Sequence, residues 1–220
     1  MQVTITGGEP LGVIDQAAPH IKQLFAAGVH INMNSNLSLL DRATARWLAA
    51  VGLRSFLVSL PTADQKTFQL ITGRKLSLDA TMCGIQIAIK AGLPVVVNMV
   101  VTKLNLHQVF ETARFAKSLG VVKFCATRAS VPANCQDFGK HEISRDELNA
   151  MLTELSRVRD RLGMKIESLE FYPPCSIDDE EARTTFSLAR SCTAGKTTAV
   201  IGFDFQLRAC PHIANGYGDI

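Results

Sequence analysis

The sequence lacks the features of a membrane-embedded or exported protein. It contains no run of about 18 apolar residues, the length that a membrane-spanning helix requires. Its opening segment, MQVTITGGEP, has neither the basic start nor the apolar stretch of a secretory signal. The net charge of +3 is too small to favour nucleic acid or an acidic membrane surface as a partner. We therefore expect a cytoplasmic protein that binds neither nucleic acid nor membranes.

Closely spaced cysteines are also absent. No two of the 6 cysteines are separated by two or three residues, and the nearest pair in sequence is Cys125 and Cys135. A reducing cytoplasm does not favour a disulfide framework, so metal or cluster ligation is the better interpretation for some of them. Cys83 and Cys125 lie in apolar runs and are predicted to be buried thiols.

Apolar residues, by contrast, are plentiful and periodic. They make up 47% of the 220 residues, enough for a sizeable core in one domain with an appendage. Short apolar runs alternate with amphipathic stretches, and glycines follow the stretches as C-terminal caps would. The pattern predicts strands at 3–6, 30–34, 55–60, 95–101 and 121–126. It predicts helices at 13–27, 40–51, 78–91 and 107–119, followed by Gly28, Gly52, Gly92 and Gly120. Repeated βα units of this kind form a parallel sheet.

The pattern changes after residue 130. A loop is expected at 130–143, and Ser144 with Glu147 forms a capping box for a helix that ends near Leu162. A further strand is predicted at 164–171 and an exposed acidic stretch within 172–191. Residues 192–210 are predicted to form a small β-hairpin with a cysteine at each end.

Small or polar residues follow five of the predicted strands. Parallel strands in a βα barrel place their carboxyl ends at one edge, where active sites lie. The pattern therefore favours one shared pocket, although each residue alone is also typical of caps and turns. The residues concerned are Gly7, Gly8, Glu9, Asn34, Ser35, Asn36, Ser59, Asn105 and Arg128.

The segment Gly7-Gly8-Glu9-Pro10, directly after the strand at 3–6, is the most informative motif. Two glycines allow positive φ angles and a close approach of the backbone to a ligand. A neighbouring carboxylate can accept hydrogen bonds from an ammonium group, and the proline fixes the turn. A phosphate ligand fits less well, because no Lys or Arg lies nearby and the glutamate would repel it.

This motif resembles the one that holds the amino group of S-adenosylmethionine (SAM) in radical SAM enzymes. The stretch Asn34-Ser35-Asn36 resembles the family's Thr-Asn-Gly, with Leu37 in place of the glycine, and 56–60 resembles its serine-bearing fourth strand. The resemblance covers about residues 2–130. It implies a partial (β/α)6 TIM-like barrel, with SAM and a [4Fe–4S] cluster as cofactors. It also implies cofactor contacts from Gly7, Gly8, Glu9, Pro10, Asn36, Ser59, Asn98 and Arg128.

The C-terminal part resembles the start of a SPASM-type extension, which binds auxiliary [4Fe–4S] clusters in enzymes that modify peptides and proteins. The resemblance implies Cys192 and Cys210 as cluster ligands, and Cys175 as an additional one. Phe205 stands where the family pattern has glycine. A pair of free thiols facing each other across the hairpin is the alternative. The expected organisation is a core at 1–130, a completing helix and linker at 131–191, and the extension at 192–220.

The family's C-x3-C-x2-C cluster motif is missing from the sequence. Either this chain is a fragment, or it is a degenerate relative that kept the fold and lost the chemistry. Thiolates hold such a cluster, so we expect the chain as given to be inactive. We predict that the parent protein is a radical SAM enzyme acting on a peptide or protein. The alternative is a non-catalytic module that binds SAM or a peptide.

Two further expectations complete the sequence-based interpretation. An ordinary βα-barrel enzyme with a phosphate substrate would need a basic glycine loop, for which 72–75 is the one candidate. A sheet that lacks its first strand exposes an edge, which invites self-association and poor solubility.

Overall fold

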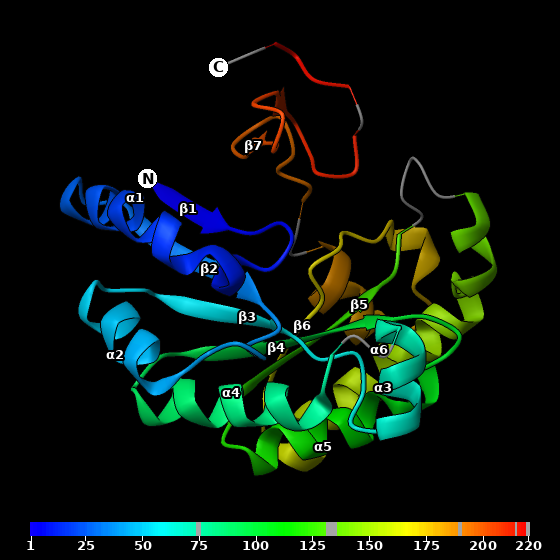
Figure 1. The fold of residues 1–220 in the computed structure, drawn as a ribbon. Helices are drawn as coiled ribbons and strands as arrows, with labels where there is room; N and C mark the ends of the chain where they lie inside the picture. Colours follow the sequence, from blue (N-terminus) through cyan, green and yellow to red (C-terminus); the bar gives the residue numbers. More distant parts are fainter. Residues whose placement is uncertain (74–75, 131–135, 189–190, 214, 219–220) are drawn as a thin grey trace.

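The computed structural model describes residues 1–73, 76–130, 136–188, 191–213 and 215–218. Six parallel strands form one curved sheet, helices cover its convex face, and a small two-stranded unit follows at the C-terminal end (Figure 1). The fold is α/β, a partial TIM-like barrel, as predicted.

The strands pair in the order of the sequence, from β1 to β6. All five pairings are parallel, as expected for strands joined by helical crossovers. β6 is shorter than the strand predicted at 164–171, because its pairing with β5 ends at Glu167. The strands are β1 (Gln2–Ile5), β2 (His30–Ser35), β3 (Ser55–Ser59), β4 (Val95–Val101), β5 (Lys123–Arg128) and β6 (Lys165–Glu167).

The four predicted helices between the strands are confirmed, and so is the helix after residue 144. They are α1 (Ile14–Ala26), α2 (Arg42–Ala50), α4 (Leu78–Lys90), α5 (Val109–Ser118) and α6 (Arg145–Leu162). Two helices were not predicted, α3 (Gln65–Thr72) and α7 (Glu180–Arg183). Shorter helical turns are η1 (Pro10–Val13), η2 (Leu106–Gln108), η3 (Gln136–His141), η4 (Pro174–Ser176) and η5 (Thr184–Leu188).

The helix ends follow the predicted chemistry. The Ser144 hydroxyl accepts from the Glu147 amide while the Glu147 carboxylate accepts from the Ser144 amide, which confirms the capping box. The four glycines predicted as C-terminal caps all have positive φ, between 73° and 97°.

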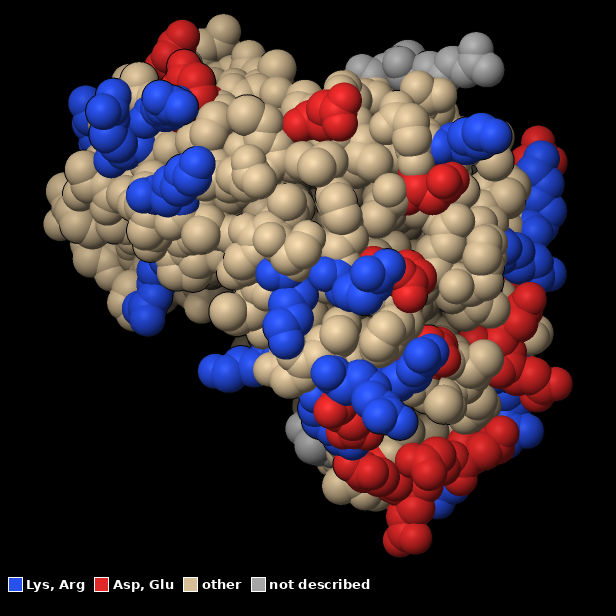
Figure 2. All heavy atoms as spheres, turned by 90° about the horizontal axis from the view of Figure 1, so that it is seen from below, with Lys and Arg blue, Asp and Glu red and all other residues tan. Residues whose placement is uncertain are grey.

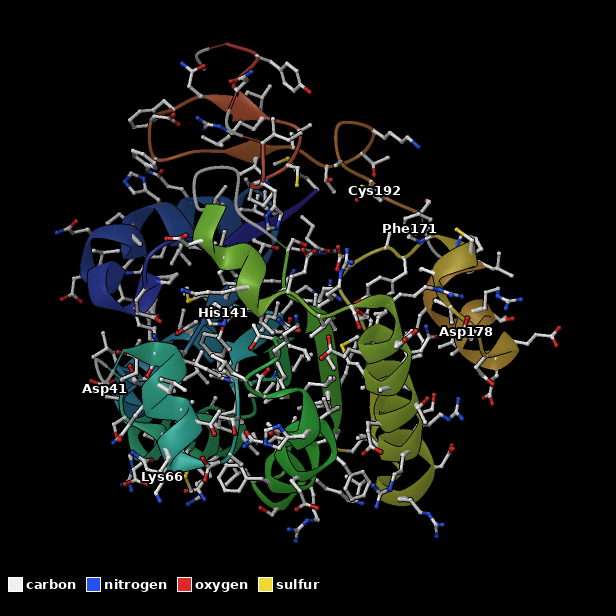
Figure 3. All side chains as sticks on the ribbon, turned by 90° about the vertical axis from the view of Figure 1, so that its right-hand side faces the viewer. Asp41, Lys66, His141, Phe171, Asp178 and Cys192 are labelled. Carbon is white, nitrogen blue, oxygen red and sulfur yellow. The ribbon has the colours of Figure 1, made fainter. Side chains whose placement is uncertain are left out.

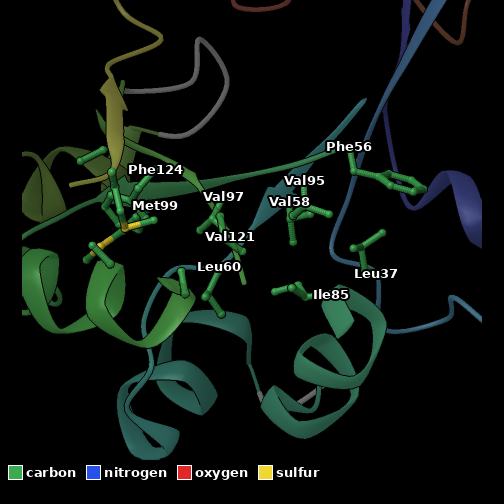
Figure 4. Packing of buried hydrophobic residues seen from close by; sticks show 14 of the residues in the cluster. Leu37, Phe56, Val58, Leu60, Ile85, Val95, Val97, Met99, Val121 and Phe124 are labelled. Atoms are coloured by element: carbon green, nitrogen blue, oxygen red, sulfur yellow. The ribbon is translucent and has the colours of Figure 1, made fainter. Parts of the chain in front are cut away.

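The two faces of the sheet differ in polarity. The face under the helices is apolar and includes Phe56, Val58, Val97 and Met99, all with 0% exposure (Figure 4). On the concave face, the strand register sets polar side chains next to one another instead. There Ser55 donates to Asn32 at 2.9 Å, and Thr127 donates to Asn98 at 2.9 Å. Burial by the helices thus drives sheet formation, while the concave face stays suited to polar ligands.

Leu37 has an unusual backbone conformation with φ of 58°. It stands in place of the glycine of the Thr-Asn-Gly motif described above. Its side chain is fully buried in the core (Figure 4). Helix α4 packs directly on this backbone at Gly84. A Cβ atom there would overlap the carbonyl oxygen of Leu37 and would lie 2.8 Å from its carbonyl carbon. Gly84 therefore permits the close contact between α4 and the loop after β2.

The C-terminal unit is a hairpin, as predicted, in which β7 (Val200–Ile201) pairs antiparallel with β8 (Leu207–Arg208). Phe205, in its turn, has φ of 58°. Phe205 stands where the SPASM-type pattern has glycine. Like Leu37, it therefore has a left-handed backbone at a position where the pattern has glycine. The hairpin region exposes Ile201, Phe203, Phe205, Leu207, Ile213 and Tyr217.

The prediction for the two core cysteines is half confirmed. Cys125 is buried on β5, whereas Cys83 is exposed, so its predicted burial is wrong. Helix α4 turns Leu78, Ile85 and Ala88 toward the core, and Cys83 lies outside that stripe. In the part of the chain that the structure describes, no helix is long and apolar enough to cross a bilayer.

Candidate active site

The GGEP segment leaves β1 at its carboxyl end and turns into η1. Gly7 and Gly8 have φ angles of 89° and 44°, and a Cβ atom added to either would meet nothing within 4 Å. A side chain at either position would be strained although space is open. Both glycines are exposed and have the positive φ angles that the sequence predicted.

The Glu9 carboxylate fastens this segment to the end of β2. Its Oε1 accepts from the Ser35 hydroxyl at 2.6 Å and from the Leu11 amide at 3.1 Å. Its Oε2 accepts from the Asn36 amide at 3.0 Å. Three of the roughly four acceptor positions of a carboxylate are therefore used within the chain. Glu9 has a positioning role that the sequence did not reveal, and about one of its acceptor positions is not used by these three donors.

Ser35 is the centre of this arrangement and was missing from the predicted cofactor contacts. It is 4% exposed, donates to Glu9, and accepts from the Leu37 amide at 2.9 Å. Its hydroxyl thereby links the GGEP segment to the left-handed turn after β2. The signal was present in the sequence, since Ser35 lies in the Thr-Asn-Gly-like segment, but its partner is 26 residues away.

The predicted residues of the next two strands lie side by side. Ser59 ends β3 and is exposed, and it is the register partner of Asn98 on β4. Asn98 is 8% exposed and is fixed by the hydroxyl of Thr127. Asn36 follows β2, where its side-chain oxygen accepts from the Ser38 amide at 2.8 Å. The parallel register thus places Ser59 beside Asn98, while Asn36 follows the last paired residue of β2.

Arg128 ends β5 and is held by an acidic partner. Its guanidinium donates to both oxygens of Glu170, at 3.3 Å and 3.1 Å, and Glu142 lies 4.0 Å away. The hydrogen bond to Glu170 is the main cause that raises the pKa of Arg128. The Arg128 amide also donates to the Tyr172 hydroxyl at 3.2 Å. Burial raises the pKa of that hydroxyl, which keeps it a neutral partner.

Asn105 does not belong to the shared pocket that its sequence position suggested. It is fully buried, and its side-chain amide donates to the carbonyls of Pro61 and Val100 at 2.8 Å and 2.9 Å. Its side-chain oxygen accepts from the Thr102 amide at 2.7 Å. Asn105 therefore joins the ends of β3 and β4 structurally.

The cysteines predicted as cluster ligands lie outside the six-stranded sheet. Cys175 is exposed in η4, Cys192 is exposed at the start of the extension, and Cys210 is half-buried beyond β8. Figure 3 shows Cys192 above Phe171 and Asp178, which lie in the segment between β6 and α7. Across the described residues, no three His, Cys, Asp or Glu side chains gather as a metal site would require.

The family model of the Radical SAM superfamily matches residues 2–116, which is more than half of the chain. The chain belongs to this superfamily. Its sequence is 32% identical over 161 residues to a GTP 3',8-cyclase of Staphylococcus carnosus, covering 70% of this chain and 45% of that protein. It is 29% identical over 124 residues to an AdoMet-dependent heme synthase of Methanosarcina barkeri, covering 54% and 34%. The chain thus spans less than half the length of either relative.

Solved structures confirm the radical SAM fold. SuiB of Streptococcus suis matches with a TM-score of 0.76 at 19% identity, over 96% of this chain and 50% of that one. The enzyme anSMEcpe, solved with AdoMet and a peptide, matches with a TM-score of 0.70 at 14% identity, over 97% and 62%. The superfamily uses SAM and [4Fe–4S] clusters, and both neighbours have been solved with SAM bound.

The described residues fit one of these cofactors and not the other. The open peptide groups of Gly7 and Gly8 and the remaining acceptor position of Glu9 suit the ammonium end of SAM. A [4Fe–4S] cluster needs several thiolates close together, and the part of the chain described here gathers no such set.

Proposed function

We propose that this chain forms the SAM-holding wall of a radical SAM enzyme that modifies a peptide or protein. The observation that carries the proposal is the anchoring of the GGEP segment to β2 through Glu9 and Ser35. That anchoring fixes two open glycine peptides at the strand ends, beside the carboxyl end of β2.

In this proposal different residues bind different chemical groups of SAM. Glu9 and the backbone of Gly7 and Gly8 hold the ammonium group, while Pro10 fixes the turn. Ser59 and Asn36 lie where a carboxylate or a ribose can be bound, with Asn98 supporting Ser59 from β4. Arg128 places a cation at the end of β5, held in position by Glu170. SAM, when bound, supplies the hydrogen-abstraction chemistry of the family.

A peptide or protein is the proposed substrate, because structures of two peptide-bound proteins share this fold. SuiB has been solved with its precursor peptide SuiA, with a TM-score of 0.69 to this chain. The hairpin with Cys192 and Cys210 is proposed as the start of a SPASM-type extension with auxiliary cluster ligands. Other relatives are named for GTP and heme chemistry, so the substrate class needs its own test.

Binding of SAM to this chain tests the site itself. We expect calorimetry to detect binding to the wild-type chain and a loss of about tenfold in affinity for Glu9→Ala, which removes the anchor. Ser38→Ala, on the neighbouring loop after β2, is the matched control and should bind like wild type. Equal affinity of the wild type and Glu9→Ala would refute the assigned site.

Activity requires a cluster, so the enzymatic test needs the upstream reading frame as well. We expect that frame to encode C-x3-C-x2-C, and the extended protein, reconstituted anaerobically with iron and sulfide, to release 5′-deoxyadenosine from SAM. A demonstrable cluster without this product would disprove the enzyme assignment. An upstream frame without the three cysteines would favour the alternative, a non-catalytic module that binds SAM or a peptide.

The phosphate-barrel alternative gains no support. Gly73 has φ of 67° and ends α3 as its C-terminal cap, so it does not open a helix N-terminus for an anion. The basic pair of that segment, residues 74–75, lies outside the described residues.

A further inference from the structure

Helices α2 and α4 enclose a groove of about 320 Å³ on the outer, helical side of the molecule. Helix α4 contributes Cys83, Gln86, Ile87 and Lys90, whose spacing of three and four residues places them on one stripe. The close contact of Gly84 with the loop before α2 holds α4 near its neighbour. The groove is therefore built into the packing of two helices.

The groove carries three positive charges and no acidic lining residue. Arg42 and Arg46 of α2 face Lys90 of α4 across it. Asp41, next to Arg42 in sequence, uses its carboxylate to cap α2 by accepting from the Thr44 amide at 2.7 Å. Figure 2 shows this helical side, with a basic group and a smaller acidic group next to it at the upper left, and most of the acidic side chains at the lower right. The local field therefore favours an anion.

The floor of the groove is apolar. Ala45 is fully buried there, and the half-buried Ile87 and Ala91 complete it. Its volume lies within the range of small-molecule sites, about 300–1,000 Å³, which combine apolar surface with a few convergent polar groups. A ligand that matches both features has an apolar body and more than one negative charge.

We propose that this groove binds a small organic anion that carries two negative charges, as carboxylates or a phosphate, on an apolar body. Arg42, Arg46 and Lys90 bind the charges, and the Ala45–Ile87 floor contacts the apolar part. None of the GGEP residues lines the groove, so the proposal does not rest on SAM binding.

Cys83 provides a direct reporter, because its thiol is exposed within the groove. Two methanethiosulfonate reagents of similar size, one with a sulfonate and one with a trimethylammonium group, are reacted with the full chain. Modification is followed at each cysteine by mass spectrometry. Each rate is divided by the rate of the same reagent with a small free thiol, because the thiolate itself favours the cationic reagent. We expect the normalised rate at Cys83 to be about tenfold higher for the anionic reagent, with a smaller ratio at the exposed Cys175. High salt should reduce the ratio at Cys83.

Protection experiments then identify the ligand class. Phthalate and phenyl phosphate represent the carboxylate and phosphate forms, and benzamide is their uncharged counterpart. We expect one or both anions to slow the modification of Cys83 at constant ionic strength, and benzamide to have no effect. Protection by an acidic peptide alone, with neither small anion effective, would overturn the proposal in favour of a protein partner.

Matched variants test whether the charge preference and the protection of Cys83 depend on the basic residues of the groove. Arg46→Gln with Lys90→Gln should abolish both the charge preference and the protection. Lys22→Gln, which removes an exposed cation of α1 outside the groove, should leave both unchanged. All substituted side chains are exposed, and circular dichroism confirms folding. Equal normalised rates for the two reagents at Cys83 in the folded wild-type chain would also overturn the proposal.

Discussion

A single carboxylate organises the candidate site. Sequence reasoning identified Glu9 from its place in the GGEP motif and assigned it to an ammonium ligand. The structure shows that most of its acceptor capacity is used by Ser35, Asn36 and Leu11. This role could not be predicted from the sequence, because the parallel pairing of β1 with β2 creates the contact. The motif thus indicated a candidate site, but not the hydrogen bonds that Glu9 accepts within the chain.

The Glu9–Ser35 contact predicts coupled stability effects. Glu9→Gln replaces one acceptor oxygen by a donor, and Ser35→Ala leaves the buried Leu37 amide without its acceptor. Each should lower the free energy of unfolding by about 1–3 kcal/mol. The double variant should lose less than the sum, because both changes break the same bond. Urea unfolding measures all three, and strict additivity would show that the contact carries no energy.

Gly84 predicts a steric effect at one position of α4. A Cβ atom there would overlap the backbone of Leu37, which cannot rotate away as a flexible side chain would. Gly84→Ala should therefore destabilise the protein by about 1–3 kcal/mol or more, despite the higher helix propensity of alanine. Gly12→Ala is the control, because its nearest neighbour would lie 3.8 Å away. An unchanged thermal midpoint for Gly84→Ala would disprove the close contact.

At the scale of elements, strands and helices with a strong apolar periodicity could be predicted from the sequence. The strand Val95–Val101 has the predicted bounds, and the apolar run of a strand covered by helices explains this. Helix α3 escaped prediction because it has 8 residues and buries only Phe68. Strand β6 ends early because its continuation binds other groups, as when the Leu169 amide donates to the Thr127 hydroxyl. Tertiary contacts of this kind leave no local pattern.

The N-terminal cap of α2 predicts a dependence on pH. The Thr44 amide donates to Asp41 and lowers the pKa of that carboxyl below its ordinary value of 3.8. A depressed pKa in the folded state means that the stabilisation is complete above about pH 4 and is lost as the pH falls through the folded-state value. Asparagine caps a helix equally well but does not titrate. Asp41→Asn should therefore lose less stability than the wild type between about pH 5 and about pH 3.

Urea midpoints across that interval measure the effect. The control is Asp15→Asn, which removes an exposed carboxylate that is not an N-terminal cap. A wild-type pH profile for Asp41→Asn would show that the Asp41 cap contributes no acid-sensitive stability.

At the scale of the whole molecule, the sheet has two outer strands. Within the described residues, β1 pairs with β2 alone and β6 with β5 alone. Outer strands offer free backbone groups to other chains, which is the physical basis of the predicted self-association. The polar concave face opposes nonspecific aggregation, so the two features act in opposite directions. The fold class could be predicted from the sequence. Which strands are outermost, and which face of the sheet is polar, became clear only from the arrangement of the strands.

A charge on the outer strand tests the association. Thr4 lies on β1 and is exposed, and Thr4→Lys places a cation that discourages edge pairing. We expect light scattering to show dimers or larger species for the wild type and a smaller associated fraction for Thr4→Lys. Gln23→Lys adds the same charge on α1, away from the edge, and should behave like the wild type. A monodisperse wild-type monomer would contradict the prediction.

The left-handed residue Leu37 has a consequence for how this chain can evolve. Its backbone keeps a conformation that glycine adopts freely, while its side chain fills the core at 0% exposure. The conformational strain costs about 1 kcal/mol, and emptying a buried leucine site costs several times more. A change of Leu37 to glycine would thus destabilise the protein even though it relaxes the backbone. We therefore expect proteins that evolve from this chain to retain a bulky apolar residue at position 37.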